Sequence, residues 1–346
     1  MNKKIAVVLF NLGGPDSPES VYGFLRNLFN DSAILNIPFP FRQILSYIIA
    51  KKRTPVAKEI YMQIGGSSPI LSETKKQAEK LQNLLDQNCK VFISMRYWHP
   101  LSKETIYNVL KWKPDKILLV PLYPHFSTTT TGSSIDDWFK SSKKLFEGIP
   151  TRAICCYPTD KLFIDSHIAL IKKEIDKIND IKNVKILFSA HGLPKSIIKK
   201  GDPYAWQVEQ TVMAIVNDLA IKSDNWVLCY QSKVTPVEWL KPYTEQEIIN
   251  AAKENKKIII VPIAFVSEHS ETLVELDKEY LELAKTNGIQ TYIRVPALGI
   301  ENTFIQSLAK MINLNIEYIT NQFSIGSSTI LKICPSYYSK CRNKRT

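Results

Sequence analysis

The sequence of 346 residues lacks several features that would place it quickly in a class of proteins. No apolar run approaches the roughly 20 residues that a membrane-spanning helix needs. The apolar residues 5–10, which follow Lys3 and Lys4, stop at Asn11, whereas a secretory signal needs roughly 7–15 apolar residues and a small-residue cleavage site. We therefore expect this segment to form a first buried strand and the protein to stay in the cytoplasm.

The common catalytic and binding fingerprints are also missing. The chain contains no P-loop and no HExxH zinc motif. Gly13-Gly14-Pro15 after the first apolar run is too short for a dinucleotide-binding loop. No nucleic-acid-binding motif and no stripe of alternating aromatic and basic residues is present, which argues against a nucleic-acid partner.

The six cysteines form no CxxC pair. Scattered cysteines in a cytosolic protein are usually buried small hydrophobes or simple thiols. Cys334 and Cys341 near the C-terminus are two thiols, which is fewer than the four ligands of an iron–sulfur cluster. We therefore expect no tightly bound cofactor and no such cluster, and the role of these two cysteines stays open.

What the sequence does have is an excess of basic residues, with a formal net charge of +12. The charge indicates either an anionic partner or a lysine-rich composition, and scattered pairs such as Lys75-Lys76 favour composition. One local cluster, Lys51-Lys52-Arg53, follows the apolar segment 39–49. That segment is either an ordinary core helix or an apolar lip that contacts a membrane surface or admits a flat apolar substrate.

Short apolar runs alternate with longer amphipathic segments along the chain. Runs rich in Val, Ile and Leu without polar alternation are typical of strands buried on both faces of a parallel sheet. The expected strands are 5–10, 91–95, 117–123, 153–157, 185–190, 226–230, 258–266 and 292–297, with helical patterns at 73–85, 163–178, 271–284 and 303–312.

This alternation predicts an α/β protein. The two sets of four strands suggest two Rossmann-like domains, each with a mainly four-stranded parallel sheet flanked by helices. We place an N-terminal domain with the lip at 1–158, a C-terminal domain at 159–325 and a basic tail at 326–346. Ligands of such sheets bind beyond the carboxyl ends of the strands.

Polar side chains of the second half fall at such strand ends. His191 directly follows the run 185–190, and the run 258–266 leads into His269 and Glu271. Glu275 follows at four-residue spacing, so it shares a helix face with Glu271. An isolated histidine is often structural, and an acidic helix face is often only solvated. Taken as a set, imidazole and carboxylate suit divalent metals such as Fe(II).

Specific motifs spread over about residues 5 to 310 resemble the ferrochelatase family, in the order that the family has them. They are Asn11-Leu12-Gly13-Gly14-Pro15, Arg53-Thr54-Pro55, Tyr61, Ile64-Gly65-Gly66-Ser67-Ser68-Pro69-Ile70, Arg96-Tyr97-Trp98-His99-Pro100-Leu101, Thr131-Gly132-Ser133-Ser134, Ser189-Ala190-His191-Gly192-Leu193-Pro194, Gly201-Asp202-Pro203-Tyr204, Gln231-Ser232-Lys233, Pro262-Ile263-Ala264-Phe265, Glu271-Thr272-Leu273 and Glu275-Leu276-Asp277.

The resemblance implies an enzyme, a lyase that inserts Fe²⁺ into protoporphyrin IX as the last step of haem biosynthesis. It implies a porphyrin cleft between the two domains, with His191 and Glu271 as the catalytic and metal-contacting pair and His269 and Glu275 supporting them on a proton path. The implied porphyrin contacts are Arg53, Tyr61, Ser68 and Trp239. The implied partners are porphyrin and ferrous iron as substrates, with peripheral membrane contact through the lip.

The chain also departs from some relatives. Thr128 stands where they carry a cysteine that binds an iron–sulfur cluster together with cysteines of a C-terminal extension, so a cluster of that type is not expected here. Two alternatives remain open, a coproporphyrin ferrochelatase and a non-catalytic porphyrin or haem carrier on the same scaffold. Which of His191 and Glu271 first binds iron stays undecided.

Overall fold

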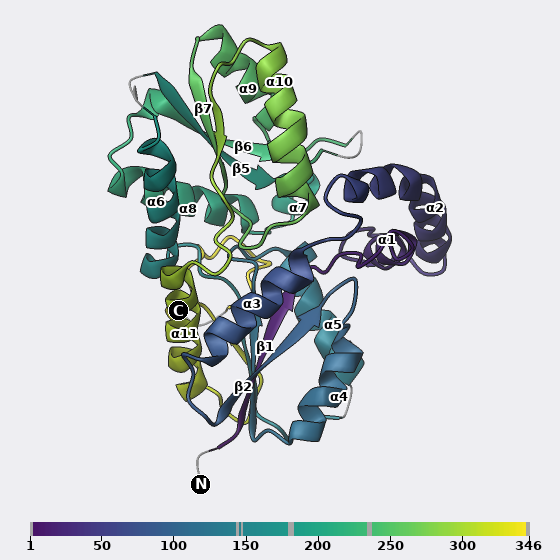
Figure 1. Cartoon of the computed structure of the whole chain (residues 1–346). Coiled ribbons are helices and arrows are strands. Elements are labelled where there is room, and N and C mark those ends of the chain that lie inside the picture. Colours follow the sequence, from purple (N-terminus) through teal and green to yellow (C-terminus); the bar gives the residue numbers. More distant parts are fainter. Residues whose placement is uncertain (1–2, 143–144, 147, 179–182, 234–236, 344–346) are drawn as a thin grey trace. The chain divides into compact units, whose positions relative to one another are not determined.

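A computed structural model describes residues 3–142, 145–146, 148–178, 183–233 and 237–343. The chain divides into two compact units, described separately below. The first unit lies within Met1–Cys156, Leu308–Ile333 and Arg342–Thr346, and the second within Tyr157–Ser307 and Cys334–Cys341. Both contain a parallel sheet with flanking helices (Figure 1), which confirms the α/β class predicted from the alternating pattern.

The first unit is built on a five-stranded sheet of order β2-β1-β3-β4-β9, in which every pairing is parallel. Its elements are β1 (Ile5–Asn11), α1 (Val21–Phe29), α2 (Phe41–Met62), α3 (Ile70–Gln82), β2 (Cys89–Met95), α4 (Ser102–Trp112), β3 (Lys116–Pro121), the π-helical turn η1 (Thr128–Gly132), α5 (Ser133–Ser142), β4 (Thr151–Ile154), the C-terminal part of α11 (Asn302–Glu317) and β9 (Ser324–Gly326).

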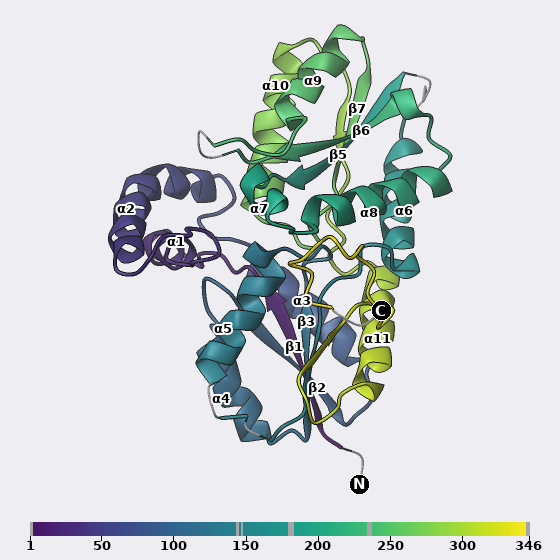
Figure 2. The same ribbon diagram turned by 180° about the vertical axis from the view of Figure 1, so that it is seen from behind.

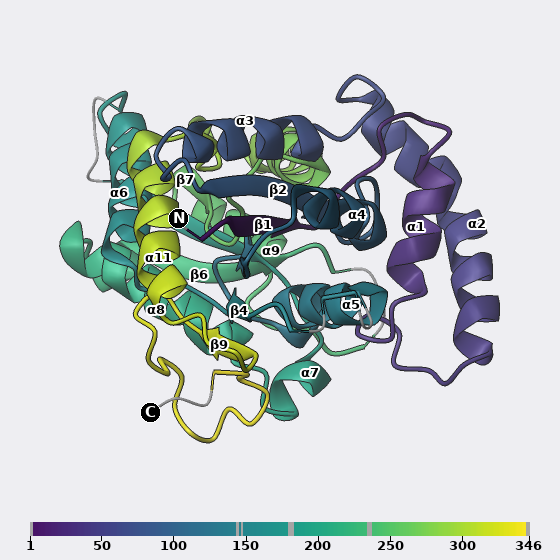
Figure 3. The same cartoon turned by 90° about the horizontal axis from the view of Figure 1, so that it is seen from below.

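The core of the first unit explains why its strands read as unbroken apolar runs. All seven residues of β1 are buried. Ala6, Val8 and Phe10 pack against α4 and α5, where Trp138 is fully buried. Figures 2 and 3 show α11 on the opposite side of this sheet from α4 and α5. Helices on both faces leave no polar face on the central strand, as expected for a parallel sheet.

The second unit is built on a four-stranded parallel sheet of order β6-β5-β7-β8. Its elements are α6 (Lys161–Ile175), β5 (Val184–His191), α7 (Lys195–Lys199), α8 (Tyr204–Asp218), η2 (Ser223–Asn225), β6 (Trp226–Gln231), α9 (Thr244–Lys253), β7 (Lys257–Pro262), the π-helix η3 (Glu271–Glu279), α10 (Tyr280–Thr286), β8 (Tyr292–Arg294) and the start of α11. Helices α6 and α8 pack together, as do α9 and α10.

Three features differ from the expectations. The first sheet has a fifth strand, β9, which is three residues long and carries too little apolar pattern to be recognised. Because β9 pairs with β4, Leu308–Ile333 belongs to the first unit, not to a C-terminal domain that runs to residue 325. The expected helix 271–284 begins as a π-helix and becomes α-helical only at Tyr280.

Candidate active site

His191 is the last residue of β5, a strand paired on both sides, by β6 and β7. The chain then turns at Gly192, where an added Cβ would lie 2.9 Å from the carbonyl oxygen of Gln231 and 3.3 Å from the ring of Trp239. Only glycine lets the backbone pass this close. The turn therefore fixes His191 at the carboxyl edge of the second sheet, and it places Trp239, which is buried, beside that turn.

Glu271 is the first residue of η3, in the connection that follows β7. Its Oε2 lies 3.0 Å from Nδ1 of His191, and both side chains are about one-third exposed (34% for His191 and 31% for Glu271). Two residues predicted from separate strand ends thus meet in the second unit, at a point that solvent still reaches.

The two groups shift each other's pKa. Burial alone would lower the pKa of His191, but the Glu271 carboxylate outweighs it and the pKa is raised. Burial would raise the pKa of Glu271, but His191 outweighs it and lowers that pKa to about 2. Each partner favours the charged form of the other. In the pH range in which His191 is protonated, the pair therefore consists of an imidazolium and a carboxylate.

His269 precedes Glu271 by two residues and contacts its backbone. Nδ1 of His269 accepts a hydrogen bond from the Glu271 amide at 3.1 Å, which leaves the proton of a neutral ring on Nε2. The imidazole is buried, and that burial lowers its pKa. His269 is therefore a neutral support for the first turn of η3, and its own backbone amide donates to Thr272 Oγ1 at 3.0 Å.

Glu275 does not contact His191 but is held by several donors. Its carboxylate accepts hydrogen bonds from Gln231 Nε2 (2.9 Å), the Ser232 amide (2.8 Å), Ser232 Oγ (2.5 Å) and the Tyr280 hydroxyl (3.0 Å). Burial and the nearby Glu271 carboxylate raise its pKa. A carboxyl group whose pKa is raised and which has fixed partners is suited to accept and pass on a proton.

The π-helix that carries both glutamates is anchored by β8. The Arg294 guanidinium makes two hydrogen bonds to Asp277, from Nε at 2.5 Å and from Nη2 at 2.8 Å, and donates from Nη1 to Glu268 at 2.7 Å. Tyr292 on the same strand donates to the Leu276 carbonyl at 2.6 Å. π-Helical winding is rare, and here Arg294 ties Glu268, three residues before η3, to Asp277 near the end of η3.

Gln231, Ser232, Tyr280 and Arg294 were not among the predicted site residues. Gln231 is the last residue of β6 and Ser232 follows it, so the strand-end rule that selected His191 could have found them. Arg294 is the last residue of β8, but a single arginine in a three-residue strand carries no sequence signal of its role. Its function in the structure depends on Asp277 and Glu268, which lie 17 and 26 residues away.

Among the residues that the structure describes, no group of three or more His, Cys, Asp or Glu side chains is placed to hold a metal ion. His191 and Glu271 stay a predicted metal-contacting pair with one imidazole and one carboxylate. One nitrogen ligand and one oxygen ligand bind a divalent ion weakly and leave most of its coordination positions open. Such a site suits an ion that passes through to a substrate better than a resident one.

The other predicted contacts lie in the first unit. Arg53 and Tyr61 are on α2, where Arg53 is exposed with its guanidinium 5.7 Å above the Phe29 ring and Tyr61 is buried. Ser68 precedes α3, and its amide donates to the Pro15 carbonyl at 2.7 Å. It lies so close to Gly14 that an added Cβ there would be 2.5 Å from its side chain.

Two units with parallel sheets, with a polar site at a strand's carboxyl edge in the second unit, define a two-unit α/β protein with Rossmann-like sheets. The fold is similar to that of the cobalt complex of the sirohydrochlorin chelatase SirB from Bacillus subtilis subspecies spizizenii, with a TM-score of 0.53 and 8% identity over 88% of this chain and 91% of that one. A model of the ferrochelatase family matches residues 4–316, and the chain belongs to that family.

Two relatives agree with this assignment. The chain is 50% identical over 343 residues to a protein named ferrochelatase from Pelagibacter ubique (strain HTCC1062), covering 98% of each. It is 49% identical over 352 residues to a ferrochelatase from Rickettsia felis (strain ATCC VR-1525 / URRWXCal2), covering 100% of each. The family resemblance stated from the motifs is thereby confirmed.

Proposed function

We propose that the chain inserts Fe²⁺ into protoporphyrin IX to give protohaem, with His191 and Glu271 as the reacting groups. The observation that carries the proposal is the 3.0 Å contact between the imidazole and the carboxylate at a partly exposed strand edge. Membership in the ferrochelatase family supplies the reaction class.

The reaction requires the removal of two protons from pyrrole nitrogens, and the residues present can take them. In the free protein, Glu271 stabilises the protonated imidazole of His191. Fe²⁺ arriving as a substrate at Glu271 would compete for that carboxylate, lower the pKa of His191 and leave a neutral ring that accepts a proton. Glu275 would receive protons onward, while His269 holds the backbone of Glu271 in place.

Arg53, Tyr61 and Ser68 would bind the two propionates, because a guanidinium and hydroxyl groups are the usual partners of carboxylates. Trp239 would form an apolar wall against the macrocycle. Since ring distortion helps a metal to enter, binding a distorted porphyrin better than a flat one would lower the barrier.

The exposed face of α2 supports a peripheral membrane contact from the cytoplasm. The alternative that the apolar segment 39–49 is an ordinary core helix is wrong. The side chains of Phe41, Ile44 and Ile48 are 66%, 58% and 53% exposed. Lys51 and Lys52 on the same helix are also exposed, and this combination suits an anionic lipid surface. In the described part of the chain, no helix is long and apolar enough to cross a membrane. Sedimentation with anionic vesicles, compared for wild type and Ile44→Ser, tests the contact.

We also propose that iron is only a substrate and that no resident iron–sulfur cluster is bound. Thr128 offers no thiolate, all six cysteines are buried, and Cys334 Sγ accepts a hydrogen bond from Gln207 at 3.0 Å. Iron and acid-labile sulfide analysis of anaerobically purified protein tests this. Stoichiometric sulfide would refute it.

The test of the activity is an anaerobic assay of purified protein with Fe²⁺ and protoporphyrin IX, followed by the change of the Soret band. We expect turnover with protoporphyrin and much less with coproporphyrin, whose four carboxylates suit the apolar α2 face poorly. A strong preference for coproporphyrin would overturn the choice of substrate. Tight porphyrin binding without insertion would instead indicate a carrier.

A further inference from the structure

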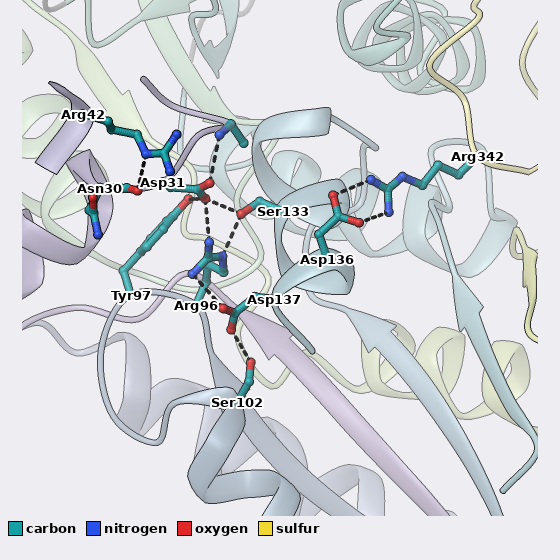
Figure 4. Close-up of polar contacts among 11 residues, drawn as sticks. Asn30, Asp31, Arg42, Arg96, Tyr97, Ser102, Ser133, Asp136, Asp137 and Arg342 are labelled. Carbon is teal, nitrogen blue, oxygen red and sulfur yellow. Dashed lines mark hydrogen bonds and ion pairs between the residues drawn. The ribbon is translucent and has the colours of Figure 1, made fainter. Parts of the chain in front are cut away.

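A buried carboxylate in the first unit takes no part in the site described above. Asp31 follows the end of α1 and is 7% exposed. Its Oδ2 accepts hydrogen bonds from Arg96 Nη2 at 2.9 Å, from the Tyr97 hydroxyl at 2.8 Å and from Ser133 Oγ, while its Oδ1 accepts from the Ala33 amide at 2.9 Å (Figure 4). Four donors on one buried side chain make Asp31 the centre of a network.

The network joins three parts of the unit. Arg96 and Tyr97 follow the end of β2, Ser133 begins α5, and Asp31 lies between α1 and α2. Arg96 also donates from Nε to Ser133 Oγ at 2.7 Å and pairs with Asp137 at 3.5 Å. Burial would raise the pKa of Asp31, but Arg96 and the hydroxyl donors outweigh it and the pKa is lowered, so the carboxylate stays charged.

Helices α1 and α2 form a pair that packs mainly against itself (Figures 1 and 3). Arg42 on α2 donates to the Asn30 carbonyl at 3.0 Å and to the Ile37 carbonyl at 2.9 Å, which ties α2 to the end of α1. The pair meets the sheet through apolar packing on Tyr97 and a hydrogen bond from Asn27 to the Tyr97 carbonyl. The Asp31 network is the charged part of this attachment.

The same helices carry predicted porphyrin contacts. Arg53 stacks on Phe29, the last residue of α1 and only two residues before Asp31. Tyr61 is buried in the same apolar cluster as Tyr97, which donates its hydroxyl to Asp31. These contacts connect Asp31 to Arg53 through Phe29 and to Tyr61 through Tyr97.

We propose that Asp31, held by Arg96, Tyr97 and Ser133, is a positioning residue for porphyrin binding that fixes α1 and α2 so that Arg53 and Tyr61 meet the propionates. The inference rests on the proposed function. Asp31 is buried and is not one of the proposed porphyrin contacts, so it should govern porphyrin affinity and leave the chemical step at His191 and Glu271 unchanged.

The test compares Asp31→Asn with the milder Tyr97→Phe and Ser133→Ala, which each remove one donor to Asp31. Loss of a hydrogen bond to a charged group predicts a porphyrin KM about 10-fold higher or more for Asp31→Asn, and a smaller rise for the other two, with kcat within about twofold. Hydrogen exchange should increase in peptides from residues 21–62. Asp136→Asn is the matched control, because it breaks the Arg342 pair on α5 without touching the network (Figure 4).

Unchanged porphyrin KM and unchanged exchange at 21–62 in folded variants would overturn the proposal, as would an equal rise in KM for Asp136→Asn. If Asp31→Asn does not fold, Tyr97→Phe and Ser133→Ala decide the question. If the wild type inserts no iron, the proposed function fails separately. Porphyrin affinity measured by fluorescence quenching then tests the positioning role of Asp31 by itself. Wild-type affinity in variants whose hydrogen exchange at residues 21–62 is raised would refute that role.

Discussion

Replacing Arg294 with glutamine should loosen the π-helix that carries Glu271 and Glu275. Arg294 pairs with both Asp277 and Glu268, so the substitution leaves these two carboxylates without the cation that bridges them. A π-helix is intrinsically less favourable than an α-helix, so without this bridge the segment should relax or fray.

The magnitude follows from the burial of the three side chains. Removing one partner of a buried ion pair costs about 3–5 kcal/mol. Arg294 is 13%, Glu268 19% and Asp277 33% exposed, so solvent screening reduces the expected loss of unfolding free energy to about 2–3 kcal/mol. For a unit of this size that corresponds to a fall in Tm of about 4–12 °C.

Two measurements check this prediction. Urea unfolding gives the free energy, and hydrogen exchange locates the change, which should appear in peptides from residues 268–279. Because a misplacement of about 1 Å at a reacting group can cost up to about 100-fold in rate, kcat should fall while porphyrin affinity changes little.

Arg152→Gln is the matched control for Arg294→Gln. Arg152 is a fully buried arginine of the first unit that donates to Asn315 and Ser324, far in sequence from the π-helix. It should lower stability without raising exchange at residues 268–279. If Arg294→Gln left both the urea midpoint and the hydrogen exchange at residues 268–279 unchanged, the inference that Arg294 anchors the π-helix would be wrong.

Three further outcomes are expected. Gly14→Ala should push Ser68 aside, since the added Cβ would lie 2.5 Å from it; overpacking should cost about 1–3 kcal/mol, and porphyrin KM should rise with kcat retained. Glu275→Gln should lower kcat without weakening porphyrin binding, and an unchanged kcat would remove it from the proton path. Glu271→Gln should lose the stabilisation of the His191 pair, measured as a urea-midpoint difference from wild type that depends on pH. Because the pKa of His191 is raised in the folded state, its contribution to the free energy of unfolding is complete below pH 6.5 and is lost as pH rises through the folded pKa. The pKa of Glu271 is lowered to about 2, so its contribution is complete above pH 4.5 and is lost toward pH 2. The difference should therefore be largest between pH 4.5 and 6.5, and a difference that grows above pH 6.5 would contradict the pairing.

The fold could be predicted from the sequence to the extent that its strands are buried on both faces. Each of the eight expected strands lies at a strand of the structure, because unbroken Val, Ile and Leu runs have few other uses in a globular protein. Strand β9 was missed because three residues at a sheet edge carry no such run. The π-helical winding of 271–279 was missed because its apolar pattern fits an α-helix as well, and the winding depends on distant partners such as Arg294.

The site could be predicted where a side chain directly follows a strand. That rule pointed to His191 and to Glu271, and the family motifs implied that they act as a pair. The structure places the two in contact. The rule gave no signal for Asp31, which lies between two helices and whose network depends on the side chains of Arg96 and Ser133, 65 and 102 residues away. Contacts of that range come from tertiary packing, which neither periodicity nor spacing records.

The most direct test of the central claim is metal insertion by His191→Ala. Under anaerobic conditions with Fe²⁺ and protoporphyrin IX, the variant should show no Soret shift to protohaem while still binding porphyrin, as measured by fluorescence quenching. His99→Ala, which removes an exposed histidine of the first unit, should keep the wild-type rate. Insertion by His191→Ala near the wild-type rate would contradict the assignment of His191 and Glu271 as the reacting pair.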